Sequence, residues 1–162
     1  MSHETQKDDE SSCKVENVTD HLSTGFETLR AEALAEGYRH IERLATDWDA
    51  GTTRFDRDGE ALVAVRVSGV LAGIGGLTAD PVVSGALRMR RFYVRPSFRR
   101  SGIARRLASA LLARAGRGRT ITVNAAAGSV PFWEALGFVP DPCDGHSHLL
   151  ARATSGAPPP KS

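Results

Sequence analysis

A strand, a sharp turn and a helix are predicted in direct succession over residues 87–116, and this stretch constrains the rest of the chain most. Aromatic and β-branched residues up to Val94 favour a strand, which Pro96 ends. After the turn at 99–104, apolar residues recur every four positions from Ile103, as on one face of a helix. Backbone N–H groups at the start of a helix have no partner within it, and the helix dipole favours negative charge there. The stretch is therefore predicted to bind an anionic group.

Charge is divided unevenly along the chain. Residues 1–60 contain 15 acidic and 7 basic residues, whereas residues 61–162 contain 4 acidic and 14 basic ones. No acid lies between Asp80 and Glu134, although eleven arginines do. A solvated helix face usually mixes both signs, so this pattern favours an anionic ligand. Nucleic acid also suits a basic patch, but we find no helix-turn-helix, zinc module or aromatic single-strand platform and expect no nucleic-acid partner.

The totals favour one ordinary globular domain. A chain of 162 residues, 41% hydrophobic and 25% charged, is long enough for one core. No apolar run approaches the ~20 residues of a membrane span and no secretory signal is recognisable, so we expect a cytoplasmic protein with no membrane partner. Cys13 and Cys143 lie far apart, and His146 and His148 do not complete a metal-type spacing. No metal site is predicted.

The predicted order of elements is β-α-α-β-β-β-α-β-α-β-β, which gives a mixed α/β (α+β) sheet with helices on its faces. Residues 1–12 and 154–162 are expected to be disordered. Residues 140–145 are predicted to form a turn between the last two strands. Glycines inside a strand weaken it unless a bulge or a close backbone approach needs them, as we expect for Gly73, Gly75 and Gly76.

Three motifs occur in this frame. They are the turn at 99–104 (RRSGIA), the segment 123–126 (VNAA) on the next strand, and 132–138 (FWEALGF). Together they resemble the GNAT acetyltransferases, which move an acetyl group from acetyl-coenzyme A to an amine. The turn is similar to the family's Gln/Arg-x-x-Gly-x-Gly/Ala turn, and 132–138 resembles the family's Phe-Tyr-x-x-Leu-Gly-Phe segment. The resemblance covers roughly residues 14–152. It implies one acetyltransferase domain over 13–153 with a mixed, mostly antiparallel sheet flanked by helices on both faces.

The resemblance also implies acetyl-coenzyme A as the co-substrate and assigns contacts to it. Backbone groups around Tyr93 would bind the pantetheine arm, and backbone N–H groups of the turn would bind the pyrophosphate with help from nearby guanidinium groups. Asn124 would bind the pantetheine amide, although it also fits a strand-end cap. Phe132 would line the far wall with its neighbour, although it also fits the core. The implied cofactor-binding residues are Phe92, Tyr93, Val94, Arg99, Arg100, Ser101, Gly102, Ile103, Ala104, Arg105, Asn124, Phe132 and Trp133.

Two departures from the family pattern leave catalysis unassigned. Trp133 stands where many relatives have a tyrosine that protonates the leaving thiolate, and an indole is not a practical acid. Arg88 stands where relatives often place a glutamate that serves as base. Glu36 and His40, beside a glycine between two helices, are the alternative bases, but Glu36 also fits a solvated helix face. Ser129 is a nearby hydroxyl that fits a helix N-cap as well.

The acceptor is predicted only as an amine of a small molecule or peptide. Tyr38, Arg88 and Arg90 are the candidate acceptor-binding residues, and the two arginines favour an acceptor with a carboxylate. Neither cysteine is near a motif that would make it a nucleophile, so we expect direct attack in a ternary complex. The alternative is a catalytically impaired acetyl-coenzyme A sensor or partner module, which Trp133 and Arg88 favour. The sequence leaves open whether the chain forms a homodimer.

Overall fold

A computed structural model of the chain describes residues 12–151, so the predictions for the two ends lie outside the described residues. The predicted order of elements is confirmed. The elements are β1 (Cys13–Asn17), α2 (Phe26–Ala35), α3 (His40–Ala50), β2 (Ala61–Val67), β3 (Val70–Ala79), β4 (Leu87–Val94), η1 (Pro96–Phe98), α4 (Ile103–Ala115), β5 (Ile121–Val123), η2 (Ala127–Ser129), α5 (Val130–Ala135), β6 (Val139–Cys143) and β7 (His146–Leu150).

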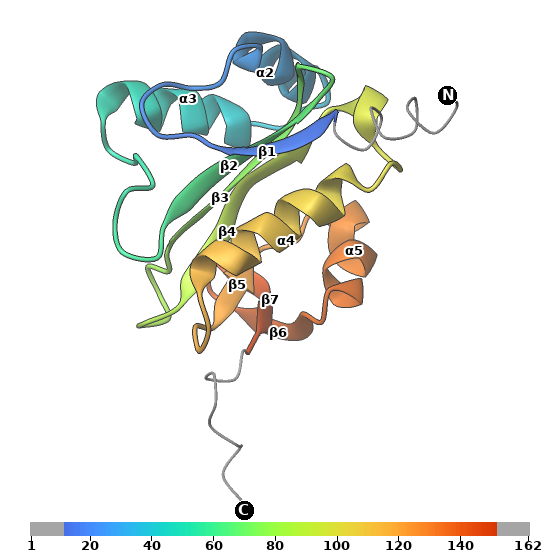
Figure 1. The fold of residues 1–162 in the computed structure, drawn as a ribbon. Helices are drawn as coiled ribbons and strands as arrows, with labels where there is room; N and C mark the ends of the chain where they lie inside the picture. Colours follow the sequence, from blue (N-terminus) through green and yellow to red (C-terminus); the bar gives the residue numbers. More distant parts are fainter. Residues whose placement is uncertain (1–11, 152–162) are drawn as a thin grey trace, which may run out of the picture.

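Seven strands form one sheet in the order β1-β2-β3-β4-β5-β7-β6. All neighbours pair antiparallel except β4 and β5, which are parallel. Helices α2 and α3 cover one face, and α4 and α5 cover the other (Figure 1). The predicted mixed, mostly antiparallel sheet with helices on both faces is therefore confirmed. No helix within residues 12–151 combines the length and the apolar character that crossing a membrane requires.

The alternation of β2 explains why both faces carry a core. Val63 and Val65 pack with α4, whereas Leu62 and Ala64 pack with α2 and α3. Side chains at successive strand positions point to opposite faces, so a strand that is apolar at every position needs cover on both sides. Helix α4 supplies that cover with its four-residue repeat, in which Leu107 and other members are buried. Burial of each such leucine stabilises the fold by ~2 kcal/mol.

A β-bulge interrupts the pairing of β3 and β4. Ile74 lies opposite Tyr93 and Gly76 opposite Arg90, so Arg91 and Phe92 together face one glycine, Gly75. Arg91 has a φ of 57°, in the left-handed region that side chains rarely adopt. A Cβ atom on Gly75 would lie 2.9 Å from the Phe92 ring. The predicted bulge and close approach are both confirmed.

The predicted turn over residues 140–145 is wrong for its first four residues. Pro140 and Cys143 lie in β6, and only Asp144 and Gly145 form the turn. Strand β6 is the last strand of the sheet, so one of its edges has no neighbouring strand among residues 12–151. An edge strand tolerates proline because the missing N–H donor can face away from the ladder, and the register shift after Pro140 absorbs the rest.

The close packing at Gly76 gives a stability test. A Cβ atom there would lie 2.5 Å from the ring of Phe55, which is buried in the core. We expect Gly76→Ala to lower the free energy of unfolding by about 1–3 kcal/mol, measured by urea denaturation. Gly128→Ala is the control, because nothing lies within 4 Å of its Cβ position. An equal effect of both substitutions would contradict this packing.

Candidate functional site

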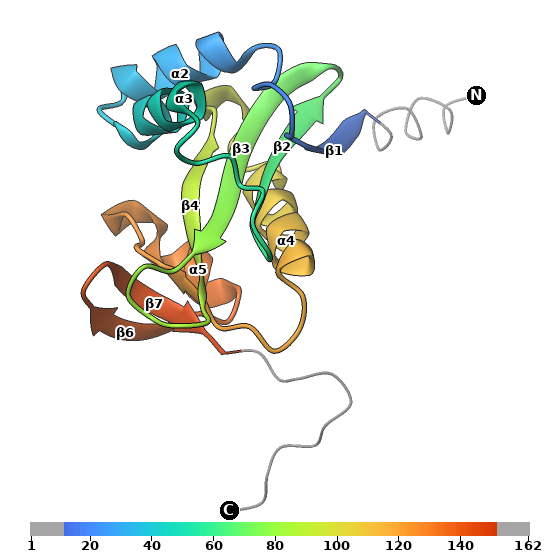
Figure 2. The same cartoon turned by 90° about the vertical axis from the view of Figure 1, so that its left-hand side faces the viewer.

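Strand β4 continues well past the end of its neighbour β5. The parallel pairing covers only Leu87–Met89 of β4 against Ile121–Val123, and β4 runs on to Val94 (Figure 2). Arg95 donates its N–H to the Ala72 carbonyl on β3, so the backbone groups of Val94 point to the opposite side. The second half of β4 therefore has an open backbone edge on the β5 side.

Side chains already occupy two carbonyl groups in this part of β4. Arg99 Nε donates to the Val94 carbonyl at 2.9 Å. His40 Nε2 lies 3.0 Å from the Phe92 carbonyl. These contacts occupy the carbonyl groups of Val94 and Phe92. The N–H of Val94 is then the donor that the open edge offers to a ligand.

The turn after β4 leads directly into the first turn of α4. Arg100 and Gly102 have φ angles of 64° and 83°, which fold the chain back on itself. The Arg106 N–H donates to the Gly102 carbonyl, so the N–H groups of Ile103 to Arg105 have no helical acceptor in front of them. The first turn of α4 contains no acid, and nothing lies within 4 Å of a Cβ position on Gly102. This turn can receive an anion.

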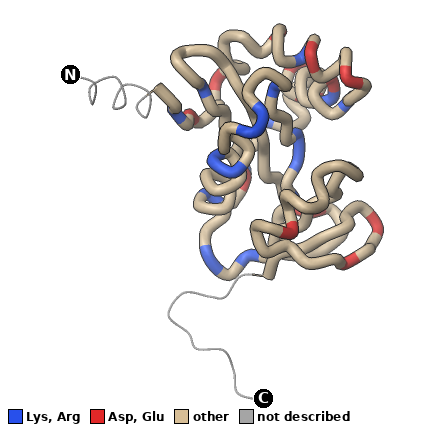
Figure 3. The backbone as a smooth tube through the Cα atoms, turned by 90° about the vertical axis from the view of Figure 1, so that its right-hand side faces the viewer, with Lys and Arg blue, Asp and Glu red and all other residues tan. Residues whose placement is uncertain are grey.

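The arginine-rich second half is partly neutralised by the acidic first half. Arg95 binds Glu32 of α2 at 2.9 Å, and Arg91 binds Asp47 of α3 at 3.2 Å. Figure 3 shows acidic positions at α2 and α3 and at the β6–β7 hairpin. At least five of the eleven arginines between 88 and 119 form ion pairs: Arg88, Arg91, Arg95, Arg99 and Arg119. The acid-free run is therefore a weaker sign of a ligand than the sequence alone indicates.

Arg99 is one of the paired arginines. Its guanidinium contacts the two Glu36 oxygens at 2.6 and 2.9 Å, and the Tyr93 hydroxyl donates to the same carboxylate at 2.5 Å. The Arg99 side chain thus points to α2, in contrast to the expectation that it faces phosphate. Within residues 12–151, no acid pairs with Arg100 or Arg105, which are exposed beside the turn. These two side chains remain available to an anion.

Glu36 is poorly suited to act as the general base. The hydrogen bonds from Arg99, and then the one from Tyr93, hold the pKa of its carboxyl below the ordinary value. Burial raises the pKa of Tyr93, so its phenol stays protonated. A carboxylate with both oxygens bound and a lowered pKa accepts a proton weakly.

His40 has a more suitable environment for that role. A carbonyl can only accept, so the contact with the Phe92 carbonyl requires the proton on Nε2 and leaves the Nδ1 lone pair free. Burial lowers the pKa of His40, which keeps the ring neutral near pH 7. Tyr38 is 39% exposed, and its ring centroid lies 5.6 Å from that of His40. Both residues were candidates from the sequence, and the structure brings them together beside β4.

Trp133 belongs to the core. It is only 3% exposed, and its ring packs edge-on against Phe92 and Phe138 at centroid distances of 4.9 and 5.4 Å. The expectation that Trp133 lines the coenzyme wall is therefore not what the structure shows. Phe132 is partly exposed and lies 5.9 Å from Phe92, so this ring alone remains accessible on α5.

The residues after β5 turn the chain toward β7. Asn124 is exposed, and the following Ala125 N–H donates to the Ser147 hydroxyl at 3.0 Å. Asn124 therefore lies directly after the last residue of β5, and its contact with the pantetheine amide stays a prediction. Ser129 occupies the N-cap position of α5, but its hydroxyl donates to the Ala126 carbonyl and makes no cap bond. The hydroxyl is engaged locally, which does not favour a role as acid.

Arg88 is buried and already paired. Its guanidinium contacts Asp80 at 3.3 Å, and Asp80 also accepts hydrogen bonds from the Thr122 hydroxyl and the N–H groups of Val82 and Val83. Arg88 therefore closes a structural network, and this pairing does not favour its predicted role in acceptor binding, which stays a prediction. A role for Asp80 was not predicted from the sequence. An acid whose carboxylate accepts from the N–H groups two and three residues later is nevertheless a common turn signal.

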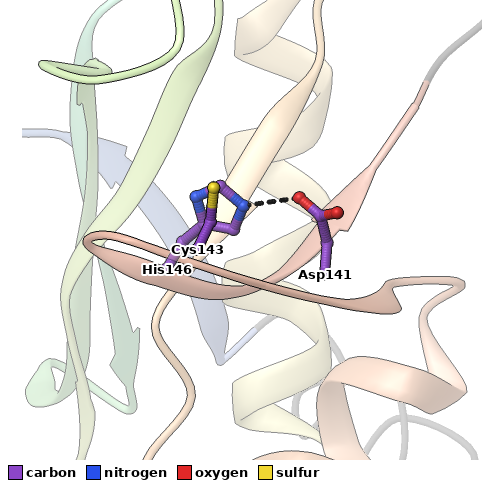
Figure 4. Close-up of side chains that lie close together, drawn as sticks. All are labelled: Asp141, Cys143 and His146. Carbon is purple, nitrogen blue, oxygen red and sulfur yellow. Dashed lines mark hydrogen bonds and ion pairs between the residues drawn. The ribbon is translucent and has the colours of Figure 1, made fainter.

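A second cluster lies in the β6–β7 hairpin. Asp141, Cys143 and His146 place one potential ligand atom each within 4.8 Å of one another (Figure 4). His146 Nε2 lies 2.8 Å from Asp141, so a hydrogen bond already joins two of the three. Asp141 was not predicted as a possible metal ligand, because the prediction rested on the spacing of cysteines and histidines alone. The absence of a metal stays a prediction.

The Glu36 network gives a pH test of stability. A carboxyl whose pKa is lowered by folding contributes stability above its ordinary pKa, and this contribution is lost as the pH falls through the lowered value. We expect Glu36→Gln to lower the free energy of unfolding at pH 7 by ~1 kcal/mol, and the difference from wild type to shrink below about pH 4. Glu27→Gln, at a more exposed glutamate of α2, is the control and should change less. A pH-independent difference in urea denaturation would contradict the network.

Comparisons with known proteins agree with this geometry. The family model for the acetyltransferase (GNAT) domain matches residues 27–146, most of the chain. No curated protein sequence matches the chain.

Several solved structures share the fold. A protein from Exiguobacterium sp. 255-15, named as an acetyltransferase, has a TM-score of 0.77 at 23% identity, and the match covers 86% of this chain and 93% of that one. YncA from Salmonella typhimurium, solved with acetyl-CoA, has a TM-score of 0.65 at 17% identity, covering 91% and 98%. An alanine N-acetyltransferase from Escherichia coli that acts on a ribosomal protein has a TM-score of 0.59 at 15% identity, covering 89% and 96%. The family match and the shared fold together show that this chain belongs to the GNAT acetyltransferases.

Proposed function

We propose that this chain transfers an acetyl group from acetyl-coenzyme A to the amine of a small molecule or peptide, by direct attack in a ternary complex. GNAT enzymes use acetyl-coenzyme A as co-substrate. The observation that carries the proposal is the open edge of β4 followed at once by an acid-free helix N-terminus. A coenzyme A molecule needs both: a strand edge for the amides of its arm and a nest of N–H groups for its pyrophosphate.

The residues present fit this coenzyme. The N–H groups of Ile103 to Arg105 and the open space in front of Gly102 suit a pyrophosphate. Arg100 and Arg105 can add positive charge from beside the turn. The Val94 N–H suits an amide carbonyl of the pantetheine arm, Asn124 suits another amide group, and the exposed part of Phe132 suits its apolar portion. Tyr93 and Trp133 would support these contacts from the core.

Backbone donors near the bulge would polarise the thioester carbonyl. Amine attack on a carbonyl carbon moves negative charge onto its oxygen, and a fixed N–H at that oxygen lowers the barrier by ~3 kcal/mol. The bulge at Arg91 and Phe92 frees backbone groups from the ladder with β3. Holding the amine and the thioester in contact would supply most of the remaining acceleration.

His40 is the residue that we propose as proton acceptor. Its Nδ1 lone pair is free, because Nε2 donates to the carbonyl of Phe92 at the bulge. A neutral imidazole in this position can take the proton that the amine loses on attack. The departing coenzyme A thiolate has a low enough basicity to leave without an acid, which is consistent with a tryptophan at position 133.

Amine-dependent release of free thiol from acetyl-coenzyme A tests the proposed transfer. We expect thiol to appear in step with an acetylated amine that mass spectrometry detects, and only when an amine acceptor is present. The alternative, a sensor or partner module, predicts acetyl-coenzyme A binding without thiol release for any amine. That result would contradict the proposed reaction.

Substitution of His40 tests the proton transfer. Burial lowers the pKa of His40 below its ordinary value of 6.5, so kcat should fall on acidification only below that pH. We expect His40→Gln, which keeps an N–H donor for the Phe92 carbonyl, to lower kcat by about 10²–10⁴-fold and to remove this acidic limb. The KM for acetyl-coenzyme A should stay the same. A His40→Gln variant with the wild-type pH profile would assign the base to another group.

A further inference from the structure

We propose that the amine acceptor carries an anionic group, a carboxylate or a phosphate, which binds Arg90 in a hollow on the α2–α3 face of the sheet. The inference rests on the proposed acetyl transfer and names the class of its acceptor. Three separate features of the hollow support it: its size and lining, an unpaired guanidinium, and a buried hydroxyl without a partner.

The hollow lies between the loop after α3 and the ends of β3 and β4. It has a volume of about 410 Å³ and is lined by Arg54, Arg57, Thr78, Asp80 and Arg90, among others. This volume is sufficient for a small-molecule ligand. Arg90 contributes from β4 at the position directly before the bulge. The hollow therefore adjoins the strand that the proposed reaction uses.

The acids around the hollow are largely engaged by the protein. Asp80 binds Arg88, Thr122 and two backbone N–H groups. Glu60 accepts hydrogen bonds from the N–H groups of Ala79 and Arg57. Asp56 lines the hollow and is exposed to solvent. The buried part of the hollow thus offers little negative charge to a neighbouring cation.

Arg90 is a half-buried cation without an ion-pair partner. Within residues 12–151, no carboxylate lies within salt-bridge distance of it, because the nearby Asp47 and Asp80 bind Arg91 and Arg88 instead. Burial and then the charge of Arg88 lower the pKa of Arg90, and Arg43 adds repulsion. A guanidinium held in partial burial among like charges is unfavourable unless an anion joins it. An anionic ligand in the hollow would relieve this repulsion.

Thr78 supplies an unsatisfied hydroxyl in the same hollow. It is 5% exposed, and its Oγ1 atom has no hydrogen-bond partner. Thr78 pairs with Arg88 and Gly76 pairs with Arg90, so Thr78 and Arg90 are diagonal neighbours on one face of the β3–β4 ladder. The Oγ1 atom is closed off from solvent, so rotation of the Thr78 side chain would be needed for it to donate a hydrogen bond to a carboxylate or phosphate oxygen bound by Arg90.

Arg90 lies close in the chain to the proposed base. It is two residues before Phe92, whose carbonyl is bound by His40, and the bulge at Arg91 and Phe92 lies between them. An acceptor in which an amine and an anionic group are separated by a few bonds can reach both positions. Short amino acids and aminoalkyl phosphonates have this separation.

Matched pairs of amines test the inference with the full chain. Each amino acid is compared with its own carboxamide, and each aminoalkyl phosphonate with the corresponding neutral amino alcohol. We expect the anionic member of the best pair to have at least a 10-fold higher kcat/KM. Arg90→Gln should lower kcat/KM for the anionic member by 10-fold or more and change that for the neutral member less than twofold, whereas Arg90→Lys should restore part of the loss. Arg114→Gln, on the last turn of α4, is the control and should leave both unchanged.

Two further results separate a binding role from a structural one. Arg90→Gln removes a half-buried cation that has no ion-pair partner within residues 12–151. Its melting temperature should therefore equal or exceed that of wild type, and a marked decrease would overturn the inference. Equal or better turnover of the neutral members, or no turnover of any panel amine, would also overturn it. Thermal stabilisation by acetyl-coenzyme A measures cofactor binding without any acceptor. If acetyl-coenzyme A does not stabilise the protein, the proposed function itself is contradicted, and not only the inference about the acceptor.

Discussion

The difference in length between β4 and β5 is the constraint on which the candidate site depends. Strand β5 pairs with only three residues of β4, and after it the Ala125 N–H binds Ser147 and turns the chain toward β7. The remaining half of β4 keeps an open backbone edge next to the N-terminus of α4. A longer β5 would satisfy that edge with its own backbone and remove the donors that a pantetheine arm needs. The fold thus creates the site by ending one strand early.

Ion pairs between the sheet and helices α2 and α3 stabilise the region around the open edge of β4. Arg91, Arg95 and Arg99, from β4 and the turn after it, bind acids on α2 and α3. These ion pairs add to the hydrogen bonds that Tyr93 and His40 make between β4 and the two helices. Such partly buried pairs fix the position of the helices more than they add stability, since desolvation offsets much of the attraction. The division of charge between the two halves of the chain therefore has a structural cause. Arg90 differs from these three arginines, because no carboxylate within residues 12–151 pairs with it.

The order of elements, the bulge and the helix N-terminus could be predicted from the sequence, since each has a local signal. The glycines at 73, 75 and 76 indicate the bulge, and the apolar repeat from Ile103 indicates α4. Contacts between residues distant in the chain could not be predicted in this way. Arg95 and Glu32 are 63 residues apart, and Arg91 and Asp47 are 44 apart. The burial of Trp133 could not be predicted either, because an aromatic residue on a helix can line a ligand site or pack in the core.

The turn before α4 is proposed to bind the pyrophosphate of acetyl-coenzyme A. The most direct test of this binding compares the thermal stabilisation by acetyl-coenzyme A of the wild-type protein with that of Gly102→Asp. A ligand at 100 times its Kd stabilises the folded state by ~2.7 kcal/mol, and the wild-type melting temperature should rise by several degrees. Gly102 has a φ of 83°, so an aspartate there strains the backbone, although aspartate enters this left-handed region more readily than most residues. Circular dichroism checks that the variant keeps the wild-type fold. Its carboxylate repels the pyrophosphate. The account predicts that this variant folds but loses the shift. An equal shift in both proteins, or none in wild type, would contradict it.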